Sequence, residues 1–322
     1  MNSPNASVVV LGTGGTIAGT ADNAADSLGY RAAQLGVMAL VATVPALAGQ
    51  ALEAEQVAQL DSKDIGPAVW QLLAQRVHAQ LARPEVAGVV VTHGTDTLEE
   101  TAWFLHRVLA PHKPVVLTAA MRPATSLQAD GPQNLLDAVT VARADGARGV
   151  LVVLAGQVHG AFGVRKAHTH RLHSFASGEC GPLAAIEAGV LRRWGDWPQG
   201  TPLGLHHVAR DDTQWPWVEV LTGVAGADPR AIQALVAAGV AGLVLSCPGN
   251  GSVAQSLLPA LQAAQAAGVA VRRASRCGDG AVLDAPDAAE PSPWPAYGAL
   301  GAVKSRVELL LELLSQPAGS AR

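Results

Sequence analysis

Short apolar runs rich in valine recur along the first half of the chain and alternate with segments of helical periodicity. Such runs carry almost no polar residue, as strands buried on both faces require. They span residues 7–11, 86–91, 115–118 and 149–155. Helical patterns lie between them, at 98–109 and 132–144. This alternation predicts an α/β fold with a larger N-terminal domain built on a flavodoxin-like parallel sheet.

Two threonine-bearing segments follow directly on the first two runs. They are Gly12–Thr16, with the sequence GTGGT, and Thr92–Thr97, with the sequence THGTDT. In open parallel sheets the residues just past the carboxyl ends of the strands converge on a ligand. A hydroxyl is a weak nucleophile until a neighbour takes its proton, and amide hydrolysis also needs donors for the developing oxyanion. The two segments therefore predict an amidohydrolase with a threonine nucleophile.

Helix starts are marked at two places. Thr97 and Glu100 have the spacing of a capping box, which predicts that Thr97 caps a helix starting at Leu98. Asp130 and Gly131 precede Pro132, and proline favours the first helical position, so a second helix is expected there.

The pattern dissolves between residues 192 and 217 into Trp, Pro, Gly and His without periodicity, which is typical of a linker. We therefore expect an N-terminal catalytic α/β domain at 1–191, a linker at 192–217 and a smaller C-terminal α/β domain at 218–322. In the C-terminal domain, helices and strands are predicted at 229–238, 241–247, 253–267 and 269–274, followed by a helix ending near Leu314.

Composition excludes several functions. A formal net charge of -4 and an aromatic content of 4% argue against a nucleic-acid partner. No apolar stretch has the length of a membrane span, and no export signal is visible, so a cytoplasmic location is expected.

Three widely spaced cysteines favour reduced thiols, and Cys247 and Cys277, which each close an apolar run, are expected to be buried. The glycine pattern after residue 11 matches neither nucleotide-binding motif.

Four segments carry a resemblance to a known family. These are Thr13–Gly19 (TGGTIAG), Thr92–Thr101 (THGTDTLEET), Ala120–Pro123 (AMRP) and Ala129–Pro132 (ADGP). Together they resemble the bacterial-type L-asparaginase family, which includes glutaminase-asparaginases. The similarity is dense through residue 182 and weaker in the second domain.

The resemblance implies roles for individual residues. Thr16 would be the nucleophile, on a loop that closes over substrate and carries Tyr30 as its hydrogen-bond partner. Thr95, Lys166 and Asp96 match a group in which the lysine lowers the barrier to deprotonating a threonine and the aspartate receives the substrate's α-ammonium.

Further residues match substrate-binding positions of the family. Ser62 would bind the α-carboxylate, and the backbone of Ala120 would face the side-chain amide. Two positions depart from many members: Lys63 stands where glutamine is frequent, and Ser252 stands where several have asparagine. Lys63 has two sensible arrangements, turned toward the carboxylate or paired with a nearby acid.

The resemblance also implies a homodimer or homotetramer, because a neighbouring subunit's second domain completes each site. The acidic residue that it supplies is left open among Asp284, Asp287 and Glu290. The expected activity is hydrolysis of L-asparagine to L-aspartate and ammonia, with asparagine preferred to glutamine. The alternatives are a glutaminase-asparaginase acting comparably on both amides and a non-catalytic amino-acid-binding protein.

No cofactor and no metal are expected. His168, His170 and His173 are spaced by two and three residues, which is weak evidence for zinc without a fourth ligand. The matching family segment binds no metal.

Overall fold

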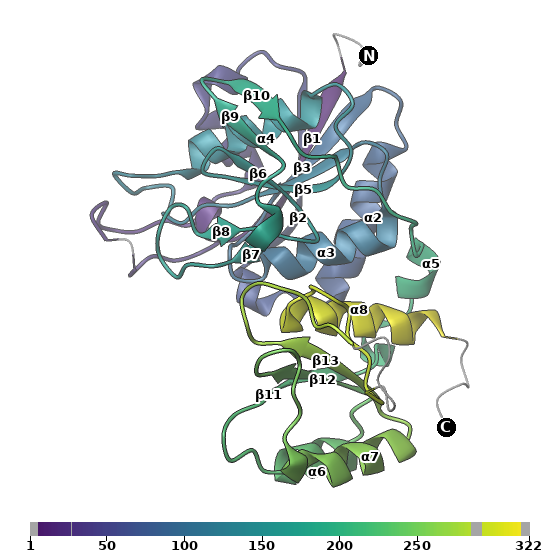
Figure 1. Cartoon of the computed structure of the whole chain (residues 1–322). Helices are drawn as coiled ribbons and strands as arrows, with labels where there is room; N and C mark the ends of the chain where they lie inside the picture. Colours follow the sequence, from purple (N-terminus) through teal and green to yellow (C-terminus); the bar gives the residue numbers. More distant parts are fainter. Residues whose placement is uncertain (1–5, 27, 285–291, 317–322) are drawn as a thin grey trace. The chain divides into compact units, whose positions relative to one another are not determined.

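The computed structural model describes residues 6–26, 28–284 and 292–316 (Figure 1). It divides into two compact units, Met1–Leu205 and His206–Arg322. The segment 192–217, expected as a linker, includes the end of strand β10 (Val190–Arg193), the short helix α5 (Leu205–Val208) and the 3-10 turn η5 (Asp212–Gln214). In the described part of the chain, no helix is long and apolar enough to cross a membrane.

An eight-stranded sheet with the order β10-β9-β6-β5-β4-β3-β1-β2 forms the centre of the first unit. Five strands are mutually parallel: β1 (Ser7–Gly14), β2 (Leu52–Leu60), β3 (Val86–Thr92), β4 (Pro114–Thr118) and β5 (Gly149–Leu154). The remaining three, β6 (Gln157–Gly160), β9 (Ala184–Glu187) and β10, pair antiparallel. The α/β class is therefore confirmed, but the sheet is mixed rather than parallel throughout.

Helices cover both faces of this sheet. Helix α4 (Gly131–Arg143) shares a core cluster with α1 (Val37–Ala42) and with alternate residues of the strands, such as Val90 and Val116. Helices α2 (Pro67–Leu81) and α3 (Leu98–Leu109) pack on each other and on the opposite face, where the rings of Trp70 and Phe104 stack at 4.9 Å.

The connections through α3 and α4 differ in hand. Both step in the same direction along the sheet, from β3 to β4 and from β4 to β5, yet the two helices lie on opposite faces. Only one of these connections can follow the usual right-handed rule. The handedness changes at β4, whereas the strand order reverses between β1 and β3, and in open α/β sheets a ligand crevice lies beyond the strand ends at such a reversal of strand order.

The capping box predicted at Thr97 is wrong. Thr97 does precede α3, but its hydroxyl donates a hydrogen bond to the carbonyl oxygen of Ser62 (2.7 Å) and makes no bond to its own helix. The start predicted at Pro132 is confirmed, since α4 begins at Gly131 with the proline in its first turn.

The smaller elements of the first unit are the hairpin of β7 (Arg165–Lys166) and β8 (Phe175–Ala176) and four 3-10 turns. The turns are η1 (Thr16–Ala18), η2 (Pro45–Leu47), η3 (Ser62–Asp64) and η4 (Gly178–Cys180). Two of them, η1 and η3, begin at residues expected in the site.

The second unit is a three-stranded parallel sheet with the order β11-β12-β13. Its elements are β11 (Val218–Thr222), α6 (Arg230–Ala237), β12 (Gly242–Cys247), η6 (Gln255–Leu257), α7 (Leu258–Ala266), β13 (Ala270–Ser275) and α8 (Ala302–Ser315). Helices α6 and α7 contribute Ile232 and Leu261 to its core. The predicted second α/β domain is confirmed, although the helix expected from residue 253 begins as the 3-10 turn η6.

Candidate active site

The two threonine segments lie side by side at the carboxyl ends of neighbouring strands. Gly12 of β1 pairs with Thr92 of β3, and the Thr13 hydroxyl donates to the Thr92 carbonyl oxygen at 2.9 Å. Thr16 and Thr95 are both buried, with 8% and 5% of their surfaces exposed. Parallel pairing therefore brings together two hydroxyls that are 79 positions apart in the sequence.

Thr16 is paired with Tyr30. The Thr16 Oγ1 and Tyr30 hydroxyl oxygens lie 2.7 Å apart, and either can donate. Tyr30 precedes Arg31, which makes a short antiparallel bridge with Thr20, so Tyr30 is held close to the segment that follows Thr16. The structure thus places together the two residues that the resemblance links.

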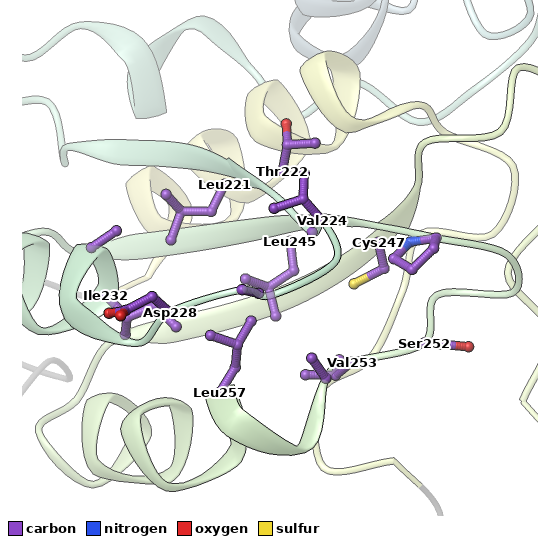
Figure 2. A pocket seen from close by; sticks show the side chains of 15 residues that line it. Leu221, Thr222, Val224, Asp228, Ile232, Leu245, Cys247, Ser252, Val253 and Leu257 are labelled. Atoms are coloured by element: carbon purple, nitrogen blue, oxygen red, sulfur yellow. The ribbon is translucent and has the colours of Figure 1, made fainter.

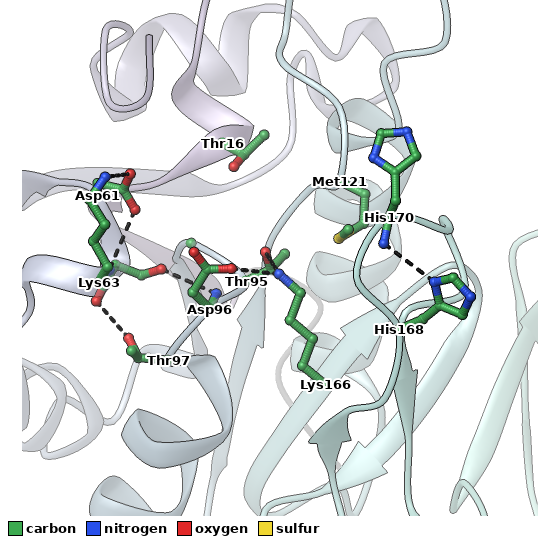
Figure 3. Close-up of polar contacts among 12 residues, drawn as sticks. Thr16, Asp61, Lys63, Thr95, Asp96, Thr97, Met121, Lys166, His168 and His170 are labelled. Carbon is green, nitrogen blue, oxygen red and sulfur yellow. Dashed lines mark hydrogen bonds and ion pairs between the residues drawn. The ribbon is translucent and has the colours of Figure 1, made fainter. Parts of the chain in front are cut away.

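Lys166 lies between Thr95 and Asp96. Its ammonium donates to Thr95 Oγ1 at 2.9 Å and forms an ion pair with the Asp96 carboxylate at 2.5 Å. The lysine side chain is 19% exposed, so its charge is partly shielded from water. Figure 3 shows the Thr16 hydroxyl oxygen turned toward this group. A cation beside a hydroxyl stabilises the alkoxide, which favours loss of the threonine proton.

Ser62 is fixed by the segment that carries Asp96. Its Oγ accepts from the Asp96 backbone N–H at 3.2 Å, and its carbonyl oxygen accepts from Thr97. Because the Ser62 Oγ acts as an acceptor there, its own proton remains available to a ligand carboxylate.

Lys63 adopts the second of the two arrangements considered above. Its ammonium pairs with the Asp61 carboxylate at 2.7 Å, and the side chain is 65% exposed. This ion pair, together with nearby Asp64 and Asp96, raises the pKa of Lys63. Sequence reasoning did not identify Asp61, although an acid two residues before a lysine was a usable signal.

The buried side chain of His93 forms hydrogen bonds that hold the second threonine segment in place. Trp70 donates to Thr101 Oγ1 (2.9 Å), which lies 3.0 Å from His93 Nε2, while His93 Nδ1 lies 2.7 Å from the Gly94 carbonyl oxygen. A carbonyl oxygen can only accept, so the imidazole carries its proton on Nδ1. The neutral ring then accepts at Nε2 from the Thr101 hydroxyl, whose oxygen accepts from the indole N–H. Burial lowers the pKa of His93 to about 4.

Ala120 lies fully buried beyond β4 and packs with Ile17, Ala18 and Leu40. It therefore contacts the residues that follow Thr16.

Ser252 lies in the second unit, beyond β12, where it lines a mostly apolar cavity of about 320 Å³ (Figure 2).

The acidic candidates of the second unit are only partly described. The Asp284 carboxylate forms an ion pair with Arg273, whose side chain is 8% exposed. Asp287 and Glu290 lie outside the described residues. The open choice among these three acids therefore stands.

Among the described residues, no group of three or more His, Cys, Asp or Glu side chains is arranged to hold a metal ion. The ring of His168 instead accepts weak hydrogen bonds from the backbone N–H groups of His170 and Arg171, at 3.3 and 3.4 Å.

Of the cysteines, Cys247 is buried as expected, but Cys277 is exposed, so the expectation of a buried Cys277 was wrong. Cys277 lies two residues beyond β13, in the loop that leaves the sheet.

Comparison with known proteins agrees with this geometry. Residues 7–196 match the family model described as asparaginase, N-terminal, and residues 217–316 match the glutaminase/asparaginase C-terminal domain. The chain belongs to the asparaginase family of enzymes.

Individual relatives extend over nearly the whole chain. L-asparaginase 2 of Escherichia coli is 38% identical in an alignment 318 residues long, which covers 95% of this chain and 88% of that protein. Glutaminase-asparaginase of Pseudomonas fluorescens is 35% identical and covers 96% of this chain and 86% of its own. A crystal structure named as a probable cytoplasmic L-asparaginase from Campylobacter jejuni aligns with a TM-score of 0.89 at 33% identity, covering 96% of both chains.

Proposed function

We propose that this protein hydrolyses L-asparagine to L-aspartate and ammonia through an acyl-enzyme on Thr16. The observation that carries the proposal is the pairing of Thr16 with Tyr30 beside the group formed by Lys166, Thr95 and Asp96. A binding protein has no need of an activated hydroxyl, and a threonine nucleophile does.

In the proposed reaction the Thr16 oxygen attacks the side-chain carbonyl carbon of asparagine. As this oxygen bonds to the carbonyl carbon, its proton passes to the Tyr30 oxygen while Tyr30 gives its own phenolic proton to the amide nitrogen, so that the C–N bond breaks and ammonia departs. A water molecule then attacks the ester carbon and the C–O bond to Thr16 breaks. One proton of that water passes through the Thr95 hydroxyl, which Lys166 holds, to the Thr16 oxygen, so the Thr16 hydroxyl is restored and aspartate is released.

Binding of the substrate's amino-acid end is proposed for residues of the same edge. The Asp96 carboxylate would receive the α-ammonium, and the Ser62 hydroxyl would donate to the α-carboxylate. Ala120 would present its backbone to the side-chain amide, and Ser252 would approach from the second unit of a neighbouring subunit. The chemistry needs no cofactor.

A glutaminase-asparaginase acting comparably on both amides is the alternative, which one relative's name favours. An assay of ammonia release from L-asparagine, L-glutamine and D-asparagine tests the proposal. We expect rapid release from L-asparagine and a clearly lower kcat/KM for L-glutamine. Equal values would support the alternative, and no release from any of the three would refute both.

The proposed active form is at least a dimer, and a homotetramer fits a pair of such dimers, since symmetric homo-oligomers are the common solution. Light scattering that found an active monomer of the chain's 32.8 kDa mass would refute a site shared between subunits.

A cytoplasmic location is proposed from the three unpaired cysteines, and fractionation of cells tests it.

A further inference from the structure

Asp130 occupies the N-cap position of α4 but does not cap it. No hydrogen bond joins its side chain to a backbone N–H group of the first turn of the helix. The carboxylate instead accepts from the backbone N–H groups of Met121, at 2.9 Å, and Arg122, also at 2.9 Å. The acceptor that normally stabilises a helix start is therefore committed to another segment, the turn at residues 119–122.

Asn134 lies one helical turn further along α4. Its side chain also forms a hydrogen bond to the 119–122 segment, at Ala119. Its Nδ2 donates to the Ala119 carbonyl oxygen at 2.9 Å and to the Asp130 carboxylate at 3.1 Å. Its Oδ1 accepts from the Ala155 N–H at 2.9 Å. Both N–H donors are used, and a flipped amide would place a donor against the Ala155 N–H, so the side chain has one orientation.

The turn held in this way lies against both threonine segments. Ala120 packs with Ile17 and Ala18, next to Thr16, and the His93 N–H donates to the Thr118 carbonyl oxygen at 2.8 Å. A Cβ atom placed on Gly131 would lie 2.9 Å from Ile17, so the start of α4 also contacts the Thr16 segment closely. The turn further lies at β4, where the hand of the connections reverses.

We propose that Asp130 and Asn134 are positioning residues that aim the Ala120 carbonyl at the departing nitrogen of the substrate, and so select carboxamides over esters. This rests on the proposed function, in which the Ala120 backbone faces the side-chain amide. A carbonyl oxygen can only accept a hydrogen bond. A carboxamide offers it an N–H, and an ester of the same acid offers none.

The test compares L-asparagine with the β-methyl ester of L-aspartate, which carries the same acyl group but offers no N–H to the Ala120 carbonyl. In Asp130→Asn, one carboxylate oxygen becomes an NH2 group that faces the backbone N–H donors, and one bond to the turn is lost. We expect the ratio of kcat/KM for the amide to that for the ester to fall at least fivefold. A general disturbance of the fold would lower both values together and leave the ratio unchanged.

Asp137→Asn is the matched control. Asp137 is buried on the same helix and accepts a hydrogen bond from Gln133 at 2.8 Å. This hydrogen bond does not include the 119–122 turn. The control should keep the wild-type ratio within twofold. If Asp130→Asn fails to fold, Asn134→Ser, which releases Ala119, is assayed in the same way and should lower the ratio in the same direction.

The outcomes separate this inference from the proposed function. Wild-type protein that hydrolyses neither substrate would refute the proposed function. Wild-type protein that hydrolyses both, with a ratio that neither Asp130→Asn nor Asn134→Ser moves by more than twofold, would refute only the positioning role.

Discussion

Gly15 and Gly94 touch backbone to backbone. A Cβ atom on Gly15 would lie 2.4 Å from both the Cα and the backbone nitrogen of Gly94, and Gly15 has a φ of +81°. Each glycine immediately precedes a threonine of the site, Thr16 or Thr95. The separation of the two threonine segments is therefore set by the absence of side chains at these two positions.

Gly15→Ala should force the two segments apart. Overpacking against backbone, added to a left-handed φ, should lower the free energy of unfolding by about 3 kcal/mol and reduce kcat on asparagine at least a hundredfold. Gly66→Ala is the control, because a Cβ there meets nothing within 4 Å and its φ is −128°. Urea unfolding and ammonia release measure both. Full activity in Gly15→Ala would show that the close contact does not position the threonines.

Lys63→Gln should raise glutaminase activity relative to asparaginase activity by a few-fold. Because Lys63 is held by Asp61, it gives no hydrogen bond to a substrate's α-amino end, and a glutamine could supply one worth roughly 1 kcal/mol. The longer substrate fits less rigidly and should gain more. The ratio of kcat/KM for the two amides decides the matter, and a ratio unmoved by the substitution would show that Lys63 does not set specificity.

Stability should rise with pH between about pH 4 and 6.5. Burial lowers the pKa of both His93 and His159 from 6.5 to about 4, so the unfolded chain binds more protons than the folded one in this interval. Each histidine therefore stabilises the fold fully above pH 6.5, and this contribution is lost as the pH falls through 4. With two such groups the slope approaches about 3 kcal/mol per pH unit.

Urea unfolding at pH 5 and pH 7 measures this slope. His93→Gln should remove about half of the difference, and the exposed His170→Gln should leave it unchanged. An equal pH dependence in all three proteins would mean that carboxylates, and not these histidines, control it.

Lys166→Met and Thr95→Val should each lower kcat severely, and the double variant should be little worse than either. Non-additivity is expected because the ammonium acts on the threonine through their 2.9 Å contact. Their free energies of activation, derived from kcat, are compared in a double-mutant cycle. Strictly additive losses would mean that the two residues act independently.

The sequence was most informative where strands are buried on both faces. The valine runs at β1 and β3 predicted their strands to within three residues, because no other arrangement buries such runs so simply. Strand β2 was missed. Its sequence, LEAEQVAQL, is polar and half exposed, since it pairs with β1 on one side only and forms the edge of the sheet.

Local rules failed where a tertiary contact competed with them. Thr97 bonds Ser62 rather than its own helix, and Asp130 bonds the 119–122 turn, although both occupy capping positions. Neither partner is close in sequence. The sequence pattern around Lys166 is that of a solvent-exposed lysine. Only the family resemblance identified it as a candidate site residue.

The nucleophile is tested most directly by Thr16→Ala. This variant should release ammonia from L-asparagine at no more than about a thousandth of the wild-type rate. Aspartate should still bind within a few-fold of the wild-type affinity, because only the chemical step is lost. Steady-state ammonia release with calorimetric titration of aspartate measures both. Turnover at a tenth of the wild-type rate or more in Thr16→Ala would contradict the assignment of Thr16.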